Sequence, residues 1–568
     1  MQNSQLAGML QQTELFSPEQ IQAVLGVMAE ANNGLTETAV EKTGIREELF
    51  LERLAQVMNL PFIRLAAAEI NPALLAKLPP KAVFLYNIVP VDFEDSILRI
   101  ATSNPLQPGL LDAVRLVTGE RIRLALSPAA DITSAAKRLY GVGAETLDRM
   151  MQDDNRIDLD EEGLFKQDLS ELDQEASVVK FVNQIIWEAH QSRATDIHIE
   201  PMETDLRIRY RIDGVLHQTP LPPALKRFQS AIISRIKVMS NMDIAEKRLP
   251  QDGRISLRIQ SEDIDVRVST IPTVYGESVS LRLLLRGSRV ITMEQLGLDP
   301  GDETVLKKMI TRPHGILLCT GPTGSGKSTS LYAWLHTINS IDKRIMSAED
   351  PIEYEMAGVN QVQMRPEIGL TFASTLRTFL RQDPDVIMVG EIRDGETADI
   401  AIRAALTGHL VFSTLHTNDS ASSINRLIDM GIEPFLISSS VEGIIAQRLV
   451  RRLCPNCRVP VDVDELKKEI LHCEGFPVEK LVDHKIYEPA GCDECRGSGF
   501  KGRTGIYEIL VITDHIRPLI IDRAPASEIM KAARAHGLRT LREDGWNKVL
   551  NGVTTVEEIL RVTEENEA

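Results

Sequence analysis

The sequence GPTGSGKS at residues 321–328 decides the fold, because it fits the pattern G-x-x-x-x-G-K-[ST] at every fixed position. The apolar residues 316–319 precede it and predict a short buried strand. After it, apolar residues recur at the spacing of one helix face, at Leu331, Trp334, Leu335 and Ile338. A strand, a glycine-rich loop and a helix in this order predict a phosphate-binding loop. A chance match in a glycine-rich turn does not explain the flanking strand and helix.

The loop residues have distinct expected roles. The glycines let backbone N–H groups close around a phosphate at the positive end of the following helix. Lys327 is expected to reach the β- and γ-phosphates of a nucleotide, and Ser328 to bind Mg²⁺. The expected nucleotide contacts are Gly321, Pro322, Thr323, Gly324, Ser325, Gly326, Lys327, Ser328 and Thr329.

Carboxylates follow two further strand-like stretches. The apolar residues 386–389 lead to Glu391, and three carboxylates, Glu349, Asp350 and Glu353, follow residues 344–347. Acidic groups at the ends of parallel strands are well placed to orient water and Mg²⁺. The alternative for the second group is an ordinary Asp-Pro turn.

Two histidines bracket a third apolar stretch, residues 410–415. His416 and Thr414 are expected beside the phosphate loop, where polar groups can sense the γ-phosphate. His409 precedes the strand, a position at which histidine is often structural, so at this point both interpretations stay open.

Four cysteines form two C-x2-C pairs separated by 34 residues: Cys454, Cys457, Cys492 and Cys495. This spacing is typical of a zinc ribbon, in which four thiolates hold one structural Zn²⁺. Disulfides and redox-active pairs are the alternatives, and a reducing compartment disfavours disulfides.

Length and charge limit the class of protein. The chain has 568 residues and a net charge of −18, so we expect three or four domains and no nucleic-acid partner. No apolar run is long enough to span a membrane, and the first residues lack the pattern of a secretory signal. These features predict a cytoplasmic protein.

The pattern along the chain predicts an α/β multidomain protein. Residues 1–144 form a mixed α/β domain, and residues 145–175, with twelve Asp and Glu against three Lys and Arg, form a flexible linker or, alternatively, an acidic docking arm. Residues 176–295 form a small α+β domain. Residues 296–568 form a domain with a parallel sheet that carries the phosphate-binding loop, and they include the cysteine subdomain at 450–505.

The small α+β domain is expected to display arginines. Residues 206–212 (LRIRYRI) alternate strictly, which places Arg207, Arg209 and Arg211 on one face of a strand and apolar side chains on the other. A second alternating strand is predicted at residues 264–268. The alternative is a solvated strand face without a further role.

Together these segments resemble the secretion ATPase superfamily of type II secretion and type IV pilus assembly, the GspE/PulE and PilB class. The resemblance covers residues 176–515. Its segments are ATDIHIEP (194–201), RIRYRIDG (207–214), RLPQDGR (248–254), GPTGSGKST (321–329), AEDPIEYE (348–355), LRQDPDVIMVGEIRD (380–394), LTGHLVFSTLHTND (406–419) and the four-cysteine segment. Residues 1–144 resemble the family's amino-terminal domain only loosely.

The resemblance implies roles for the residues above. Glu391 is the expected Walker B glutamate, and Glu353 is the expected base for the attacking water, with Glu349 and Asp350 as alternatives. His409 and His416 take a His-box role that couples the γ-phosphate to domain position.

The resemblance also implies a P-loop, RecA-like fold for residues 296–568 and a homo-hexameric ring that uses ATP, Mg²⁺ and Zn²⁺. In such a ring an arginine of the small domain neutralises transition-state charge, and the candidates are Arg207, Arg209 and Arg211, with Arg209 preferred. Residues 1–144 are expected to act as an adaptor that recruits the chain to the inner face of the cytoplasmic membrane. The expected partners are an inner-membrane platform protein and the cytoplasmic domain of a membrane adaptor protein.

The implied activity is ATP hydrolysis that powers pseudopilus assembly for type II secretion. The alternatives are type IV pilus assembly and, from a different class, a nucleotide-binding scaffold that hydrolyses little ATP. Some relatives bind cyclic di-GMP through a module with an R-L-G-type start, which residues 1–144 lack. We therefore expect no such ligand.

Overall fold

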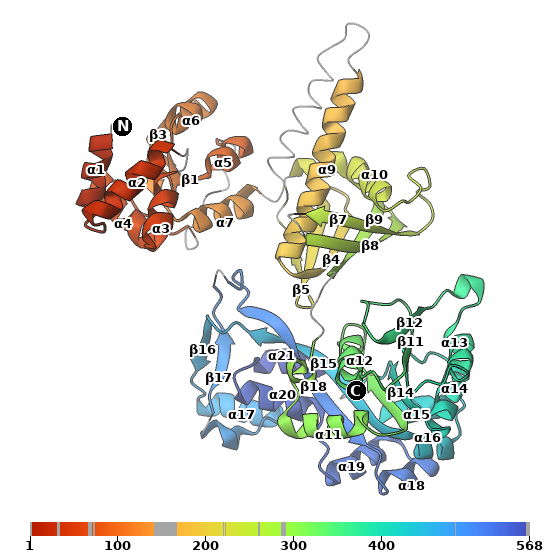
Figure 1. Ribbon diagram of the computed structural model, residues 1–568. Helices are drawn as coiled ribbons and strands as arrows, with labels where there is room; N and C mark the ends of the chain where they lie inside the picture. The colour runs from red at the N-terminus through yellow and green to blue at the C-terminus, as the bar shows by residue number, and fades with distance from the viewer. Residues whose placement is uncertain are drawn as a thin grey trace. The chain divides into compact units, whose positions relative to one another are not determined.

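The computed structural model describes residues 3–30, 34–65, 71, 74–75, 77–140, 167–219, 221, 223–259, 262–285, 291–482, 484–492 and 494–563 (Figure 1). The chain divides into two compact units, Met1–Leu285 and Arg286–Ala568. The sequence predicts a boundary at residue 295, ten residues later. Among the described residues, the structure contains no helix long and apolar enough to cross a membrane.

The amino-terminal part begins with a cluster of helices and continues into a small sheet. Its core includes Leu10, Phe50 and Leu54 in the helices and Ile88 and Ile100 in the sheet. The sheet has the order β1-β2-β3, with β1 antiparallel to β2 and β2 parallel to β3. The elements are α1 (Asn3–Gln12), α2 (Pro18–Glu30), α3 (Leu35–Thr43), α4 (Glu47–Met58), α5 (Pro80–Tyr86), β1 (Ile88–Glu94), β2 (Ile97–Thr102), α6 (Leu110–Thr118), β3 (Arg121–Leu126) and α7 (Ala129–Tyr140).

The second part is an antiparallel six-stranded sheet in the order β6-β5-β4-β9-β8-β7. One face packs on two helices through apolar residues such as Phe181, Ile185, Ile208 and Ile232. The elements are α9 (Gln167–Gln191), β4 (Ala194–Pro201), β5 (Leu206–Ile212), β6 (Val215–Gln218), η2 (Pro223–Phe228), α10 (Gln229–Met239), β7 (Gln251–Ile259), β8 (Glu262–Thr273) and β9 (Gly276–Leu285).

Helix α9 begins at Gln167, inside the segment that the sequence analysis interprets as a flexible linker. That interpretation is wrong for residues 167–175. Acidic residues near a helix amino terminus interact favourably with its positive end, so the acidic composition does not prevent a helix there. The rest of the predicted linker, residues 145–166, lies outside the described residues.

The carboxy-terminal unit contains a seven-stranded sheet in the order β12-β11-β13-β14-β10-β15-β18. All neighbouring strands are parallel except β15 and β18. The elements up to β15 are η3 (Met293–Leu296), α11 (Pro300–Ile310), β10 (Gly315–Thr320), α12 (Lys327–Ile338), β11 (Ile345–Glu349), β12 (Val359–Gln363), η4 (Pro366–Ile368), α13 (Phe372–Phe379), β13 (Val386–Val389), α14 (Gly395–Leu406), β14 (Leu410–Leu415), α15 (Ser422–Asp429), α16 (Pro434–Ser440) and β15 (Val441–Leu453).

The remaining elements form a two-stranded ribbon beside the sheet and the final helices. They are β16 (Arg458–Val461), α17 (Glu465–Cys473), η5 (Val478–Val482), β17 (Ile486–Pro489), β18 (Phe500–Val511), α18 (Ile516–Ile521), α19 (Ala526–Ala535), α20 (Leu541–Leu550) and α21 (Val556–Thr563).

The central strands of this sheet are buried on both faces, as the continuous apolar runs predict. Every residue of β10 and of β14 is buried, and separate apolar cores lie on the two sides. Because β10, β11, β13 and β14 are parallel, their carboxyl ends meet at one edge of the sheet. The expected α/β multidomain fold with a P-loop, RecA-like domain is confirmed, and this edge holds the candidate site.

Candidate functional site

The phosphate loop lies between β10 and α12, and α12 begins at Lys327. The Lys327 side chain is buried, and its Nζ donates to the carbonyl oxygens of Gly321 at 2.7 Å and Pro322 at 3.1 Å. Burial lowers the pKa of Lys327. Ser328 is exposed in the first turn of the helix. The loop therefore presents a cation and a hydroxyl group at a helix amino terminus, which suits a phosphate.

Two glycines are required by the shape of this loop. Gly321 and Gly326 have φ angles of 152° and 89°. A Cβ atom on Gly321 would lie 2.5 Å from the carbonyl oxygen of Gln447, and one on Gly326 would lie 2.9 Å from Gln447 Nε2. The loop can therefore lie close against β15 only because these positions lack side chains.

Glu349 ends β11 and is buried. Its carboxylate accepts hydrogen bonds from Ser347 Oγ at 2.6 Å, from Gln361 Nε2 at 3.0 Å and from the Tyr332 hydroxyl. Asp350 and Glu353 are exposed in the turn that follows. Of the three predicted carboxylates, Glu349 is thus held inside the fold, and the other two are open to solvent.

Glu391 and His416 come from neighbouring strand ends and meet. His416 Nε2 lies 3.2 Å from a carboxylate oxygen of Glu391, and Arg393 donates to the other oxygen. Burial alone would raise the pKa of Glu391, but the hydrogen bonds and charges of Arg393 and His416 hold it below its usual value. Because β13 pairs with β14 and β14 pairs with β10, this contact lies at the sheet edge that also carries the phosphate loop.

His409 lies at the other end of β14. Its Nδ1 contacts the carbonyl oxygen of Ala404 at 2.9 Å and the Thr407 hydroxyl at 3.3 Å. Strand β14 has six residues, so about 20 Å separate its two ends. The structure does not bring His409 to the phosphate loop, because residues that bracket a strand lie at opposite edges of the sheet. Thr414, in contrast, lies near the carboxyl end of the strand and donates to the carbonyl oxygen of Gly390 at 2.7 Å.

The predicted arginines lie on β5 in the other compact unit. Arg207 Nε and Arg209 Nε both donate to Glu200, at 2.8 and 2.9 Å, and Arg209 adds a second bond at 2.5 Å. Arg211 Nε lies 3.8 Å from Asp196, and its guanidinium donates to the carbonyl oxygen of Gly214 at 3.0 Å. Arg211 is therefore less tightly held than Arg209.

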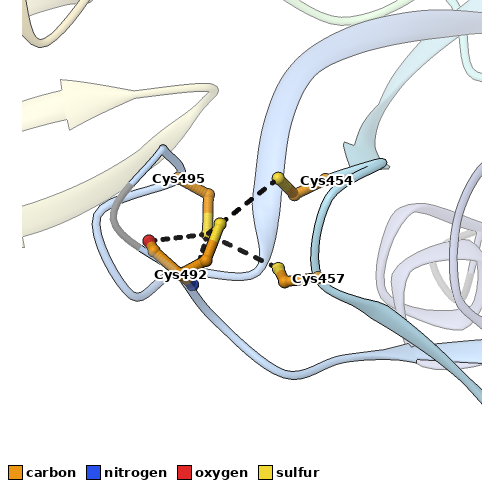
Figure 2. Close-up of side chains that lie close together, drawn as sticks. All are labelled: Cys454, Cys457, Cys492 and Cys495. Carbon is orange, nitrogen blue, oxygen red and sulfur yellow. Dashed lines mark hydrogen bonds between the residues drawn. The ribbon is translucent and has the colours of Figure 1, made fainter. Parts of the chain in front are cut away.

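The four predicted cysteines converge between the ends of β15 and β18 (Figure 2). The sulfur atoms of Cys454 and Cys492 are 3.8 Å apart, and those of Cys457 and Cys495 are 3.7 Å apart. These distances are too long for disulfides, and all four cysteines are free thiols. Four sulfur atoms at about 2.3 Å from a tetrahedral Zn²⁺ would be about 3.8 Å apart, so the residues present fit the ion.

The backbone around the cysteines also suits a thiolate site. The N–H groups of Cys492 and Gly499 donate to Cys495 Sγ at 3.1 and 3.2 Å. Such bonds stabilise a negatively charged sulfur. Cys473, on α17, is exposed and lies outside this group.

Several polar residues of the site are absent from the sequence predictions. Tyr332 and Gln361 hold Glu349, and Gln447 and Arg448 of β15 lie beside the phosphate loop and the segment that follows β14. The signal for the last two is a pair of polar residues inside the apolar stretch of residues 443–450. The pattern of apolar residues shows that a polar pair is unusual at this position, but it does not predict which residues the pair contacts.

Comparison with known families agrees with this geometry. The family model described as "Type II/IV secretion system protein" matches residues 171–561. The model of the MshEN domain matches residues 58–146, so this stretch of the amino-terminal part belongs to a known domain type. That description names a domain and not a ligand, so the expectation about cyclic di-GMP stays a prediction.

Individual relatives carry two kinds of name. The type IV pilus assembly ATPase PilB of Myxococcus xanthus is 42% identical over 532 residues, which are 92% of each chain. The type II secretion system protein E of Xanthomonas campestris is 42% identical over 567 residues, covering 98% of this chain and 96% of the relative. The protein of the same name from Dickeya dadantii is 50% identical over 432 residues, covering 75% and 84%.

Proposed function

The chain belongs to the type II/IV secretion system protein family, and we propose on that premise that it is the ATPase motor of type II secretion. It is an ATP hydrolase of the class that serves type II secretion and type IV pilus assembly. The observation that carries the proposal is that the phosphate loop with Lys327 and the contact between Glu391 and His416 lie at the same edge of a parallel sheet.

The choice of type II secretion is supported by sequence identity. Relatives named type II secretion system protein E reach 49% over 399 residues and 50% over 432 residues. Relatives named PilB reach 42% over 532 residues and 43% over 524 residues. Pilus assembly stays the alternative function, because relatives of both kinds are equally similar over most of the chain: the type II protein of Xanthomonas campestris is 42% identical over 567 residues, and PilB of Myxococcus xanthus is 42% identical over 532 residues.

The site residues divide the work of ATP hydrolysis in the following way. Lys327 and the loop N–H groups bind the β- and γ-phosphates. The hydroxyl group of Ser328 and the carboxylate of Glu391 are the residues that would hold Mg²⁺, which supplies charge neutralisation when bound. Glu353 accepts the proton of the attacking water, and His416 keeps Glu391 in position through their hydrogen bond.

An arginine from the second part of the chain completes the proposed site in a homo-hexamer. A guanidinium near the γ-phosphate neutralises transition-state charge, an effect of about 10³–10⁵ in rate in phosphoryl-transfer enzymes. Arg209 and Arg211 remain the candidates. We prefer Arg211, because Arg209 is held by two bonds to Glu200.

The four-cysteine group holds one structural Zn²⁺ in this proposal. Four protein thiolates leave no open position for a substrate or water, so the ion acts on folding and not on chemistry. It would join the ends of β15 and β18, the strands that follow the phosphate-loop strand in the sheet.

The proposed partners are an inner-membrane platform protein and the cytoplasmic domain of a membrane adaptor protein. Through them the motor would work at the inner face of the cytoplasmic membrane, with residues 1–144 as the adaptor. No nucleic-acid partner is proposed, given the net charge of −18.

The test is made in the native host, with Lys327→Ala on the chromosome. Loss of proteins released into the medium, with surface pili intact, is the result expected of a type II secretion motor. Loss of pili with unchanged release would overturn that choice in favour of pilus assembly. Purified wild type, Lys327→Ala and Glu391→Gln are compared in parallel, and equal background ATPase rates would indicate a scaffold.

A further inference from the structure

Gln447 is a buried polar residue in the middle of β15, the strand next to the phosphate-loop strand. It is 1% exposed. The neighbouring residue Ala446 pairs with Thr320, the last residue of β10, so Gln447 lies level with the start of the loop. Burying an amide group costs free energy unless its polar atoms form hydrogen bonds, so the partners of Gln447 indicate why a glutamine is found at this position.

The contacts of Gln447 reach all three parts of the phosphate-binding motif. Its Oε1 accepts a hydrogen bond from Ser330 Oγ in α12 at 2.7 Å and one from Cys319 Sγ in β10 at 3.4 Å. Because Oε1 accepts from two donors, the orientation of the amide is fixed, and its Nε2 atom points away from Ser330 and Cys319. That nitrogen lies against Gly326, and the backbone carbonyl of Gln447 lies against Gly321.

These contacts hold the loop at both ends. The loop must keep its N–H groups and the amino terminus of α12 aimed at one point to bind a phosphate strongly. Cys319 precedes the loop by two residues, and Ser330 follows it by two. One amide oxygen therefore ties the strand before the loop to the helix after it, while the two glycines rest on the same residue.

We propose that Gln447 is the positioning residue of the phosphate loop, which holds the loop in its nucleotide-binding shape without touching the nucleotide. The proposal rests on nucleotide binding by this loop and not on the choice between secretion and pilus assembly.

The test measures MgADP binding to the full-length protein by titration calorimetry. Gln447→Leu removes the acceptor at similar size, and Ser330→Ala removes one of its donors. Ser440→Ala is the matched control, because Ser440 is also buried but its hydroxyl bonds within its own helix, to the carbonyl oxygen of Leu436 at 2.7 Å. Thermal unfolding without nucleotide checks that each variant folds.

We expect the Kd for MgADP to rise about tenfold in Gln447→Leu and severalfold in Ser330→Ala, as loss of a buried hydrogen bond implies. The double variant should bind no more weakly than Gln447→Leu, since both changes break the same bond. The kcat at saturating ATP should stay within about twofold of wild type, because Glu391 and His416 are held by other contacts. A merely structural role would not separate affinity from kcat in this way.

Three results would overturn the proposal. The first is a Kd within twofold of wild type in both single variants. The second is a double variant whose Kd rises by the product of the two single fold-increases, which would mean that Gln447 and Ser330 act independently. The third is an equal loss of affinity in Ser440→Ala. If Gln447→Leu does not fold, Ser330→Ala decides alone, and an unchanged Kd rejects the proposal. MgADP binding needs no secretion partner, so this result is separate from the test in the host.

Discussion

The imidazole of His416 and the carboxylate of Glu391 join two neighbouring strand ends, with 3.2 Å between Nε2 and the nearer carboxylate oxygen. The contact orients Glu391 at the sheet edge that also carries the phosphate loop. His409 belongs to the same strand as His416 but makes its contacts at the opposite edge of the sheet. The two histidines therefore give a matched pair for mutation.

We expect His416→Ala to lower kcat about 10²-fold, with little change in MgADP affinity, because a catalytic carboxylate loses its orientation. His409→Ala should lower kcat no more than about threefold and should mainly lower the unfolding temperature. Steady-state ATPase kinetics and thermal unfolding measure both effects. Equal losses of kcat in the two variants would contradict the division of roles.

The carboxylates at the end of β11 and after it are also expected to divide into one that stabilises the fold and one that acts in catalysis. Glu349 accepts three hydrogen bonds in the interior, whereas Glu353 is exposed. Glu349→Gln should destabilise the fold by roughly 1–3 kcal/mol, because three donors lose a charged acceptor. Glu353→Gln should lower kcat about 10²-fold or more at an unchanged unfolding temperature. If Glu353→Gln keeps wild-type turnover, Asp350 becomes the next carboxylate to test.

Local sequence patterns predicted much of this site, because they report on single elements. The strict alternation of residues 206–212 and the apolar run at 316–319 follow directly from which faces are buried. The positions of Glu391 and His416 follow from a general property of parallel sheets, that strand ends share an edge. The same property argues against a shared site for His409 and His416, since they flank one strand.

The contacts of β15 could not be predicted in this way. Gln447 meets Cys319 and Ser330 across more than a hundred residues of sequence. A pattern of apolar residues places Gln447 in a buried strand, but the neighbour of that strand depends on the sheet order. Sheet order is a property of the whole fold, and no local signal specifies it.

The cysteine group should bind one Zn²⁺ per chain. Cys495→Ser should reduce zinc content to well below one and lower the unfolding temperature, because four thiolates are needed for a closed tetrahedral site. Cys473→Ser is the control, since Cys473 is exposed and outside the group. Metal analysis by mass spectrometry on protein purified without chelators measures the ratio. Full zinc content in Cys495→Ser would reject the assignment.

The arginine face allows a comparison among three neighbours. We expect Arg211→Ala and Arg209→Ala each to lower ATP turnover at least about tenfold without weakening MgADP binding, if a guanidinium acts on the transition state. Arg207→Ala is the control, because Glu200 keeps its bonds to Arg209 when Arg207 is removed. ATPase rates are compared at a protein concentration at which the wild type is assembled. Wild-type turnover in both Arg209→Ala and Arg211→Ala would leave the face without a catalytic role.

We expect Asp544 to make the stability of the carboxy-terminal unit depend on pH. It is 1% exposed, accepts the N–H of Tyr507 at 3.0 Å, and lies near Asp299, Arg539 and Lys548. Burial raises its pKa to about 6, against the partly opposing effect of Lys548. A carboxyl group whose pKa is raised on folding favours the folded state at low pH, where it is protonated, and this contribution is lost as the pH rises from about 4 to about 6.

In Asp544→Asn this dependence is removed, because the amide stays neutral while its oxygen can still accept the Tyr507 N–H. The stability of the variant relative to wild type should therefore improve by up to about 3 kcal/mol between pH 4 and pH 8. Unfolding followed by tryptophan fluorescence over this range measures the difference, with Asp514→Asn, at an exposed position, as the control. Zinc loss at low pH affects variant and wild type alike and cancels in the comparison. A difference that does not change with pH would show that folding does not raise the pKa of Asp544.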